Sequence, residues 1–78
     1  MPKIPIIKAK DFCGLLVKYG CDLVSIRGSH HKIHNPQTNK TSVVAIHSGK
    51  DVDKGSFTDI LDQLGIDRDD FIAFVEKE

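Results

Sequence analysis

Apolar residues recur at i, i+3, i+4 and i+7 in two places, and this repeated spacing constrains the fold more than any other feature. The first set is Phe12, Leu15, Leu16 and Tyr19, and the second is Phe57, Ile60, Leu61 and Leu64. Positions with this spacing lie on one face of a helix, so each set predicts an amphipathic helix that buries one stripe. We expect the first helix over residues 8–19, ended by Gly20, and the second from a cap at Asp53 to Gly65.

The segment between the two helices has the composition of strands and turns. Residues 21–27 are rich in β-branched side chains and alternate imperfectly, with Leu23, Ser25 and Arg27 set against Val24 and Ile26. We expect strands over 21–27, 31–35 and 41–46, joined by the Gly28-Ser29 turn and by the loop 35–40, which is dense in turn formers. The three strands would form an antiparallel meander.

A short third helix is expected from Asp67, because Ile66 before the cap and Phe71 at the fourth helical position form a hydrophobic staple. Amphipathic helices must bury their stripes, and the three strands offer them a sheet. The sequence therefore predicts a single α+β domain over residues 1–78. Both long helices would cover one face of the sheet, and the other face would be left to solvent or ligand.

The chain length and the composition limit the classes of protein that this can be. A chain of 78 residues supports one core, and its apolar runs, such as 15–17 and 43–46, are far shorter than the roughly 20 residues that cross a bilayer. Residues 1–8 carry two prolines and two lysines and no cleavage site of a secretory signal. Cys13 and Cys21 are a thin framework for a secreted domain, so we expect free thiols in a cytoplasmic protein with no membrane segment.

The net charge of zero hides a division along the chain. Residues 1–50 carry eight Lys or Arg against two Asp, whereas residues 51–78 carry three basic residues against nine acidic ones. Opposite charges can still mix on a folded surface. If they do not, the basic portion would attract a polyanion such as nucleic acid, and the acidic portion would repel it or face another partner.

Three of the four histidines lie within five positions, directly behind Gly28 and Ser29. Side chains alternate across a strand, so His30, Lys32 and His34 would point one way and His31 and Ile33 the other. Since Ile33 belongs to the core, His30 is expected on the open face. A bulge at Gly28-Ser29 would shift this register by one residue and exchange His30 with His31.

An imidazole titrates near neutral pH, and on a basic surface it can act as general base on a ribose 2′-hydroxyl, which then attacks the adjacent phosphate. This reaction needs no metal ion, cofactor or protein nucleophile. Arg27 and Lys32 could stabilise charge on the phosphate, and Gly28 and Ser29 would give the RNA access to the backbone. His30 is therefore the candidate catalytic residue, with His31 as second choice.

Three other interpretations stand beside RNA cleavage. A surface histidine is often inert. The histidines and cysteines include zinc-ligand types, although no Cys-x-x-Cys pair is present and no second ligand pair has a suitable spacing. The third is a non-catalytic RNA-binding module, in which bases would have to be recognised without stacking, because all five aromatic residues lie in the expected helices.

Three segments together resemble the HicA-type toxins of bacterial toxin–antitoxin systems. They are Gly28-Ser29-His30, His47-Ser48-Gly49-Lys50, and Lys54-Gly55-Ser56-Phe57 at the start of the helix that continues to Ile66. The segments occur in the order and spacing of that family, and the resemblance covers about residues 8–75.

The resemblance implies a fold similar to double-stranded-RNA-binding domains, with the order α-β-β-β-α. It also implies an mRNA endoribonuclease that arrests growth and is held inactive by a HicB-type antitoxin. The histidine of the Gly-Ser-His motif, which falls on His30, would be catalytic, and members with the histidine one place later would point to His31. Cleavage specificity, oligomeric state and the role of His47 are left open.

Overall fold

The computed structural model describes residues 4–47 and 49–78, so Ser48 of the His-Ser-Gly-Lys segment and part of the amino terminus lie outside the described residues. It contains α1 (Ala9–Tyr19), β1 (Asp22–Arg27), β2 (His30–Asn35), β3 (Lys40–Ala45), α2 (Lys54–Leu64) and α3 (Arg68–Lys77). This is the predicted order. The ends of the strands differ from the predicted ones by no more than one residue.

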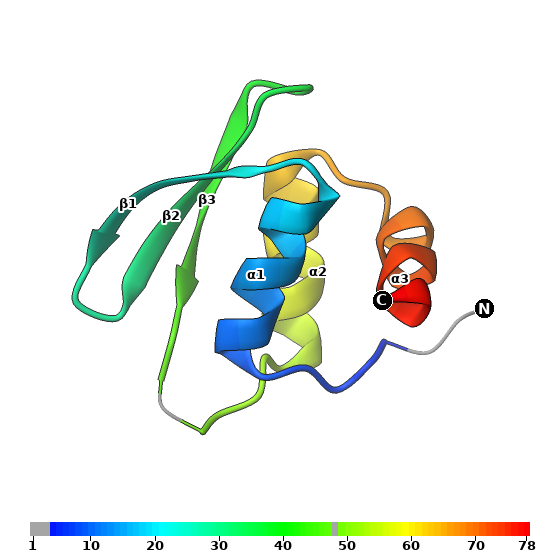
Figure 1. Cartoon of the computed structure of the whole chain (residues 1–78), viewed down its shortest axis with the longest axis horizontal. Helices are drawn as coiled ribbons and strands as arrows, with labels where there is room; N and C mark the ends of the chain where they lie inside the picture. Colours follow the sequence, from blue (N-terminus) through cyan, green and yellow to red (C-terminus); the bar gives the residue numbers. More distant parts are fainter. Residues whose placement is uncertain (1–3, 48) are drawn as a thin grey trace.

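The three strands form an antiparallel sheet in the order β1-β2-β3. Figure 1 shows α1 and α2 on the same side of this sheet, and α3 beyond them, away from the strands. The prediction of an α+β domain with both long helices on one sheet face is confirmed. Within the described parts of the chain, no helix has the length and apolar character needed to span a bilayer.

The helix ends follow from capping chemistry. The Asp53 carboxylate accepts a hydrogen bond from the Ser56 backbone N–H at 2.7 Å, and the Asp67 carboxylate accepts one from Asp70 at 3.1 Å. Each carboxylate satisfies a donor that the first helical turn leaves unpaired. Gly65 ends α2 with a left-handed φ of 70°, which glycine adopts without steric cost.

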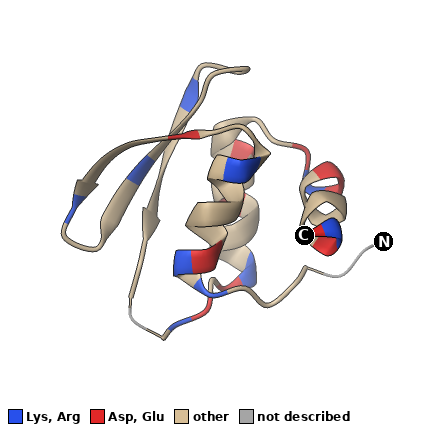
Figure 2. Cartoon of the chain, in the orientation of Figure 1, with Lys and Arg blue, Asp and Glu red and all other residues tan. Residues whose placement is uncertain are grey.

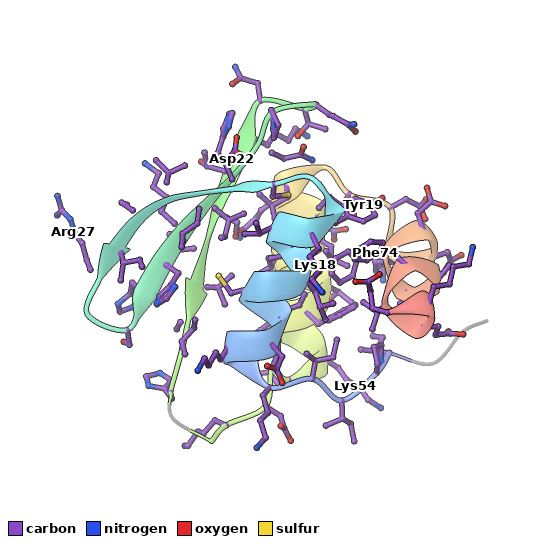
Figure 3. All side chains as sticks on the ribbon, in the orientation of Figure 1. Lys18, Tyr19, Asp22, Arg27, Lys54 and Phe74 are labelled. Atoms are coloured by element: carbon purple, nitrogen blue, oxygen red, sulfur yellow. The ribbon has the colours of Figure 1, made fainter. Side chains whose placement is uncertain are left out.

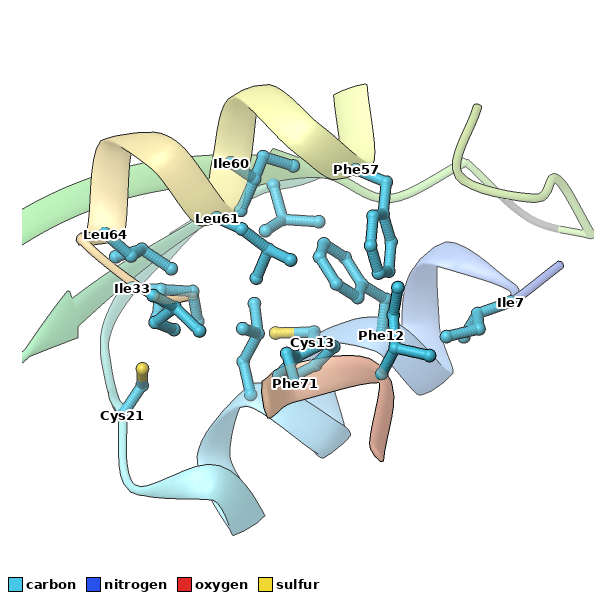
Figure 4. Close-up of a cluster of buried hydrophobic side chains, with 14 residues drawn as sticks. Ile7, Phe12, Cys13, Cys21, Ile33, Phe57, Ile60, Leu61, Leu64 and Phe71 are labelled. Carbon is cyan, nitrogen blue, oxygen red and sulfur yellow. The ribbon is translucent and has the colours of Figure 1, made fainter. Parts of the chain in front are cut away.

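The core lies between the sheet and the three helices (Figure 4). Phe12, Phe57 and Phe71, one from each helix, are fully buried, and their ring centroids are 5.3–5.9 Å apart. Ile33 and Val44 enter the same core from β2 and β3. The two apolar stripes read from the sequence therefore meet each other, and the sheet closes one side of them.

The third helix is longer than predicted. Ile66 and Phe71 are both buried, as the staple requires, but α3 has ten residues, only one fewer than α1 or α2. Tyr19 of α1 packs edge-on against Phe71 and Phe74, with ring centroids 5.3 Å away in both cases. These contacts with a residue distant in sequence help to stabilise the helix, which the sequence indicated only as short.

The loop between β2 and β3 is fixed to the carboxyl end of α2. The buried Asn35 side chain donates to the Leu64 carbonyl at 2.8 Å, and the Thr38 hydroxyl donates to the same carbonyl at 2.7 Å. Ser42 donates to the Gln63 side chain at 2.6 Å. Unpaired carbonyls at a helix end are thus satisfied by the sheet, which sets the sheet's position on α2.

The irregularity in the sheet lies in β1 and not at Gly28-Ser29. Leu23 pairs with Ile33 and Ser25 with Lys32, which leaves Val24 as an inserted residue. The bulge explains why residues 21–27 alternate imperfectly. Gly28 and Ser29 instead form a two-residue turn between Arg27 and His30, so the register of β2 is not shifted.

Candidate active site

His30 is the first residue of β2, and its side chain is exposed. In the sheet it stands opposite Arg27 of β1 on one side and Ala45 of β3 on the other. Directly opposed residues of an antiparallel pair share a face and have Cβ atoms about 4.5–5.5 Å apart. His30 therefore lies beside the root of the Arg27 side chain, on the sheet face that the helices leave open.

A shallow hollow of about 370 Å³ lies on this open face. Ser25, Arg27, His30, Lys32 and Val43 line it, and the three strands all contribute. In Figure 3 the Arg27 side chain extends away from the body of the molecule at the tip of the sheet. The hollow brings together three of the residues that the sequence singled out, namely the histidine and its two flanking cations.

Both residues of the turn beside His30 contribute to its conformation: Gly28 through its backbone angles and Ser29 through a hydrogen bond to β3's end. Gly28 has a φ of 57° while Ser29 does not have a positive φ, a pattern that matches the type II′ hairpin turn with glycine first. The Ser29 carbonyl accepts a hydrogen bond from the Ile46 N–H at 2.7 Å, which ties the end of β3 to the turn. Gly28 and Ser29 adjoin the hollow without lining it.

His31 lies on the other face, as strand parity predicts. It is half-buried against α1, and its Nδ1 atom is 3.9 Å from the Cys13 sulfur. Burial raises the pKa of the Cys13 thiol, so this neighbour is uncharged at neutral pH. His31 is thus less accessible than His30 to a ligand on the open face.

His34 shares the face of His30 but is already engaged. Its Nε2 atom lies 3.0 Å from the Asn39 side-chain oxygen, a contact that holds the ring toward the β2–β3 loop. Asn39 itself has a positive φ of 58°. Among the side chains that the structure describes, no comparable hydrogen bond holds His30, so its ring is free to reach a ligand.

His47 lies at a second hollow, of about 460 Å³, between β3 and the start of α2. Lys50 lines the same hollow, together with the carboxylates of Asp51, Asp53 and Asp59. His47 therefore does not line the His30 hollow, although Val43 borders both hollows, and the surroundings of His47 are acidic.

The possible zinc ligands are dispersed. Cys13 and Cys21 are both buried and free. Within residues 4–47 and 49–78, no three His, Cys, Asp or Glu side chains come together in a way that could hold a metal ion. Only the Cys13 and His31 pair brings a sulfur near a ring nitrogen among the side-chain contacts described.

The tertiary structure separates charge as the sequence suggested. The sheet carries Arg27, Lys32 and Lys40 against the single acid Asp22, whereas acidic positions gather on α3 and its cap (Figure 2). By register, Arg27 and Lys32 lie on the open face together with Asp22, whereas Lys40 pairs with the buried Asn35 and lies on the side of the helices.

Sequence reasoning missed two residues of the hollow. Ser25 pairs with Lys32, and Val43 pairs with Lys32 from the other side. Both positions follow from the register of the strands, which no local motif reveals. Their side chains give the hollow a hydroxyl at one side and an apolar floor.

The order α-β-β-β-α, with a three-stranded antiparallel sheet covered on one face by two helices, is consistent with the fold of double-stranded-RNA-binding domains. The chain is more closely defined by its sequence, since residues 9–66 match the family model described as the HicA toxin of bacterial toxin–antitoxin systems. The protein therefore belongs to the HicA toxin family. Searches of curated proteins and of solved structures found no match.

Proposed function

We propose that this toxin is an mRNA-cleaving endoribonuclease, that it acts in the cytoplasm, and that a HicB-type antitoxin neutralises it. The observation that carries the proposal is the exposed His30 ring in a hollow lined by Arg27 and Lys32. Membership of the HicA family supports a toxin, and the residues of this hollow support cleavage of RNA as its activity.

In the proposed reaction, the neutral His30 imidazole removes the proton of a ribose 2′-hydroxyl. The 2′-oxygen attacks the adjacent phosphorus, and the bond to the 5′-oxygen of the next nucleotide breaks. The products are a 2′,3′-cyclic phosphate and a 5′-hydroxyl, and the leaving oxygen takes its proton from the imidazolium or from water. The protein contributes no nucleophile and the step requires no redox partner.

Arg27 and Lys32 would bind the phosphate and stabilise the negative charge that grows on its oxygens during attack. Arg27 stands opposite His30, and Lys32 lies two positions along β2, on the same face. With a cation on either side of His30, one phosphate would be held within reach of the imidazole. Gly28 and Ser29 would contact the RNA backbone beside the turn.

Accessibility supports His30 over His31 as the base. His31 is half-buried beside Cys13, on the sheet face that packs against the helices, whereas the exposed His30 lies on the open face. A single general base contributes typically 10²- to 10⁴-fold to a rate, so we expect a slow ribonuclease.

The test is cleavage of an mRNA transcript by the purified protein, with and without a chelator. His30→Gln should lower the rate about 10²-fold or more. His34→Gln, on the same face and already bonded to Asn39, is the matched control and should stay within about threefold of wild type, because its ring is not the proposed base. A transcript with 2′-deoxyribose at the cleaved position should resist.

Each alternative predicts a different outcome of this experiment. A non-catalytic RNA-binding module would retain the transcript while leaving it intact. Loss of activity in His31→Gln but not in His30→Gln would move the base to the second-choice residue. In cells, expression of the protein should arrest growth, His30→Gln should relieve the arrest, and co-expression of the antitoxin should do the same for wild type.

A further inference from the structure

The outer edge of β1 is the most unusual surface outside the hollow. The strand order β1-β2-β3 places β1 at one edge of the sheet, and no further strand pairs with it in the described parts of the chain. An edge of this kind exposes backbone N–H and C=O groups that can pair with another strand. Natural edges are often protected by lysine, proline or a bulge; β1 has the bulge at Val24 but contains neither lysine nor proline.

The side chains of β1 are both apolar and exposed. Leu23 is 42% exposed, Val24 55% and Ile26 56%, which makes β1 the main concentration of exposed large hydrophobic residues in the described chain. The strand also begins with an acid, Asp22, and ends with a base, Arg27. An apolar centre between opposite charges at the two ends is a surface that could bind a copy of itself.

Because of the bulge, Asp22 and Arg27 lie on the same face of the sheet, and Leu23 and Ile26 lie together on the other face. Asp22 and Arg27 pair with His34 and His30, which both lie on the open face. Leu23 and Ile26 pair with Ile33 and His31, on the face toward the helices. Without the inserted Val24, residues three apart in a strand, such as Leu23 and Ile26, would point to opposite faces.

If the inserted Val24 is left out, β1 has five residues in regular register that a second strand could pair with. They are Asp22, Leu23, Ser25, Ile26 and Arg27. When two such strands run antiparallel about a two-fold axis at Ser25, each Leu23 meets Ile26 of the other copy, and each Asp22 meets Arg27. The two side chains of each pair then share a face: the Leu23–Ile26 pairs lie on the face toward the helices, and the Asp22–Arg27 pairs lie on the open face. Cross-strand apolar pairs and opposite-charge pairs are the contacts that stabilise such a sheet.

We infer that β1 is a self-association edge, through which two copies of this chain pair to form one continuous sheet across a two-fold axis. The two open faces then become one surface, with a His30 hollow on each side of the axis. This inference rests on the geometry of β1 and is independent of RNA cleavage. Because the paired strands are short, the dimer is expected to be weak and concentration-dependent.

The test is sedimentation velocity of the untagged protein across a range of concentrations. We expect the mass to rise from 8.7 kDa toward twice that value, with a dissociation constant of about 0.1 mM or below. Ile26→Lys, which places a lysine in the centre of the edge, should keep the chain monomeric. Val17→Lys is the matched control, because Val17 is 45% exposed but lies on α1, and it should dimerise like wild type.

A charge exchange tests the register. Asp22→Arg places two positive side chains opposite each other at both ends of the strand pair, and should weaken self-association about tenfold or more. Adding Arg27→Asp should restore it, since the pairs are then opposite again. Circular dichroism of each variant must show the wild-type spectrum, and the restoration itself excludes misfolding as the cause.

Two outcomes would overturn the inference. A wild-type chain that stays monomeric up to about 1 mM would show that the bulge protects the edge, as bulges often do, and would leave β1 to a different polypeptide. A dimer that Ile26→Lys and Asp22→Arg leave unchanged would place the interface elsewhere. Neither result depends on whether the protein cleaves RNA.

Discussion

The contact between Gly65 and Thr38 offers a measurable test of how the sheet is seated on α2. Gly65 has a φ of 70°, and a Cβ built on it would lie 2.8 Å from Cγ2 of Thr38. Thr38 cannot turn away freely, because its hydroxyl is bonded to the Leu64 carbonyl at 2.7 Å. Gly65→Ala should therefore strain the backbone and also push the β2–β3 loop off the helix end.

The two costs can be separated with Gly28, which has a φ of 57° and open space around it. Gly28→Ala should lower the free energy of unfolding by the backbone cost alone, about 1–2 kcal/mol. Gly65→Ala should lower it by that amount and a further 1–3 kcal/mol or so from overpacking. In the Gly65→Ala background, Thr38→Ser removes Cγ2, keeps the hydroxyl, and should recover about 1 kcal/mol.

Urea unfolding followed by circular dichroism would give these differences, and thermal midpoints would move by about 4–8 °C per kcal/mol in a domain of this size. The reasoning would be refuted if Gly28→Ala and Gly65→Ala cost the same. It would also fail if Thr38→Ser gave no recovery, since the contact would then have no energetic consequence.

Three further predictions concern single groups. Asn35→Ala should lower the free energy of unfolding by about 2–3 kcal/mol in urea, because a buried amide that bonds the Leu64 carbonyl is lost; a change near zero would contradict this. Hydrogen bonds from Ser56, chiefly from its backbone N–H, lower the pKa of Asp53. The stability that the Asp53 carboxylate contributes is therefore present above the unfolded-state pKa and is lost as the pH falls through the folded-state pKa. Below about pH 5, the thermal midpoint of wild type should fall more steeply than that of Asp53→Asn. Parallel curves for the two proteins would contradict the role of Asp53 as a cap. Burial raises the pKa of the Cys13 thiol, so alkylation at neutral pH should be slow in the native protein and fast in urea, and rapid native labelling would show that α1 opens.

Most of the fold could be predicted from the sequence because its signals are local. The i, i+3, i+4, i+7 stripes, the Asp53 and Asp67 caps and the terminal Gly65 each act within a few residues, and all were confirmed. The length of α3 could not be predicted in the same way. Its later turns depend on Tyr19, which is distant in sequence.

The candidate site was predictable in part, for the same reason. The Gly28-Ser29 turn and the alternation of β2 place His30, Lys32 and His31 on their faces from sequence alone. Neither the turn nor the alternation gives the partners of these residues on β1 and β3. The role of His30 as the base stays a prediction.

The sequence by itself determined which segments are helices and strands, where α1 and α2 end, and which way the β2 side chains point, because period, capping and turn chemistry are properties of neighbouring residues. Only the tertiary structure decided the Val24 bulge, the pairing of Arg27 with His30, and the contact of His31 with Cys13. These depend on the register between strands and on the seating of helices on the sheet, which are set by the packing of the whole core.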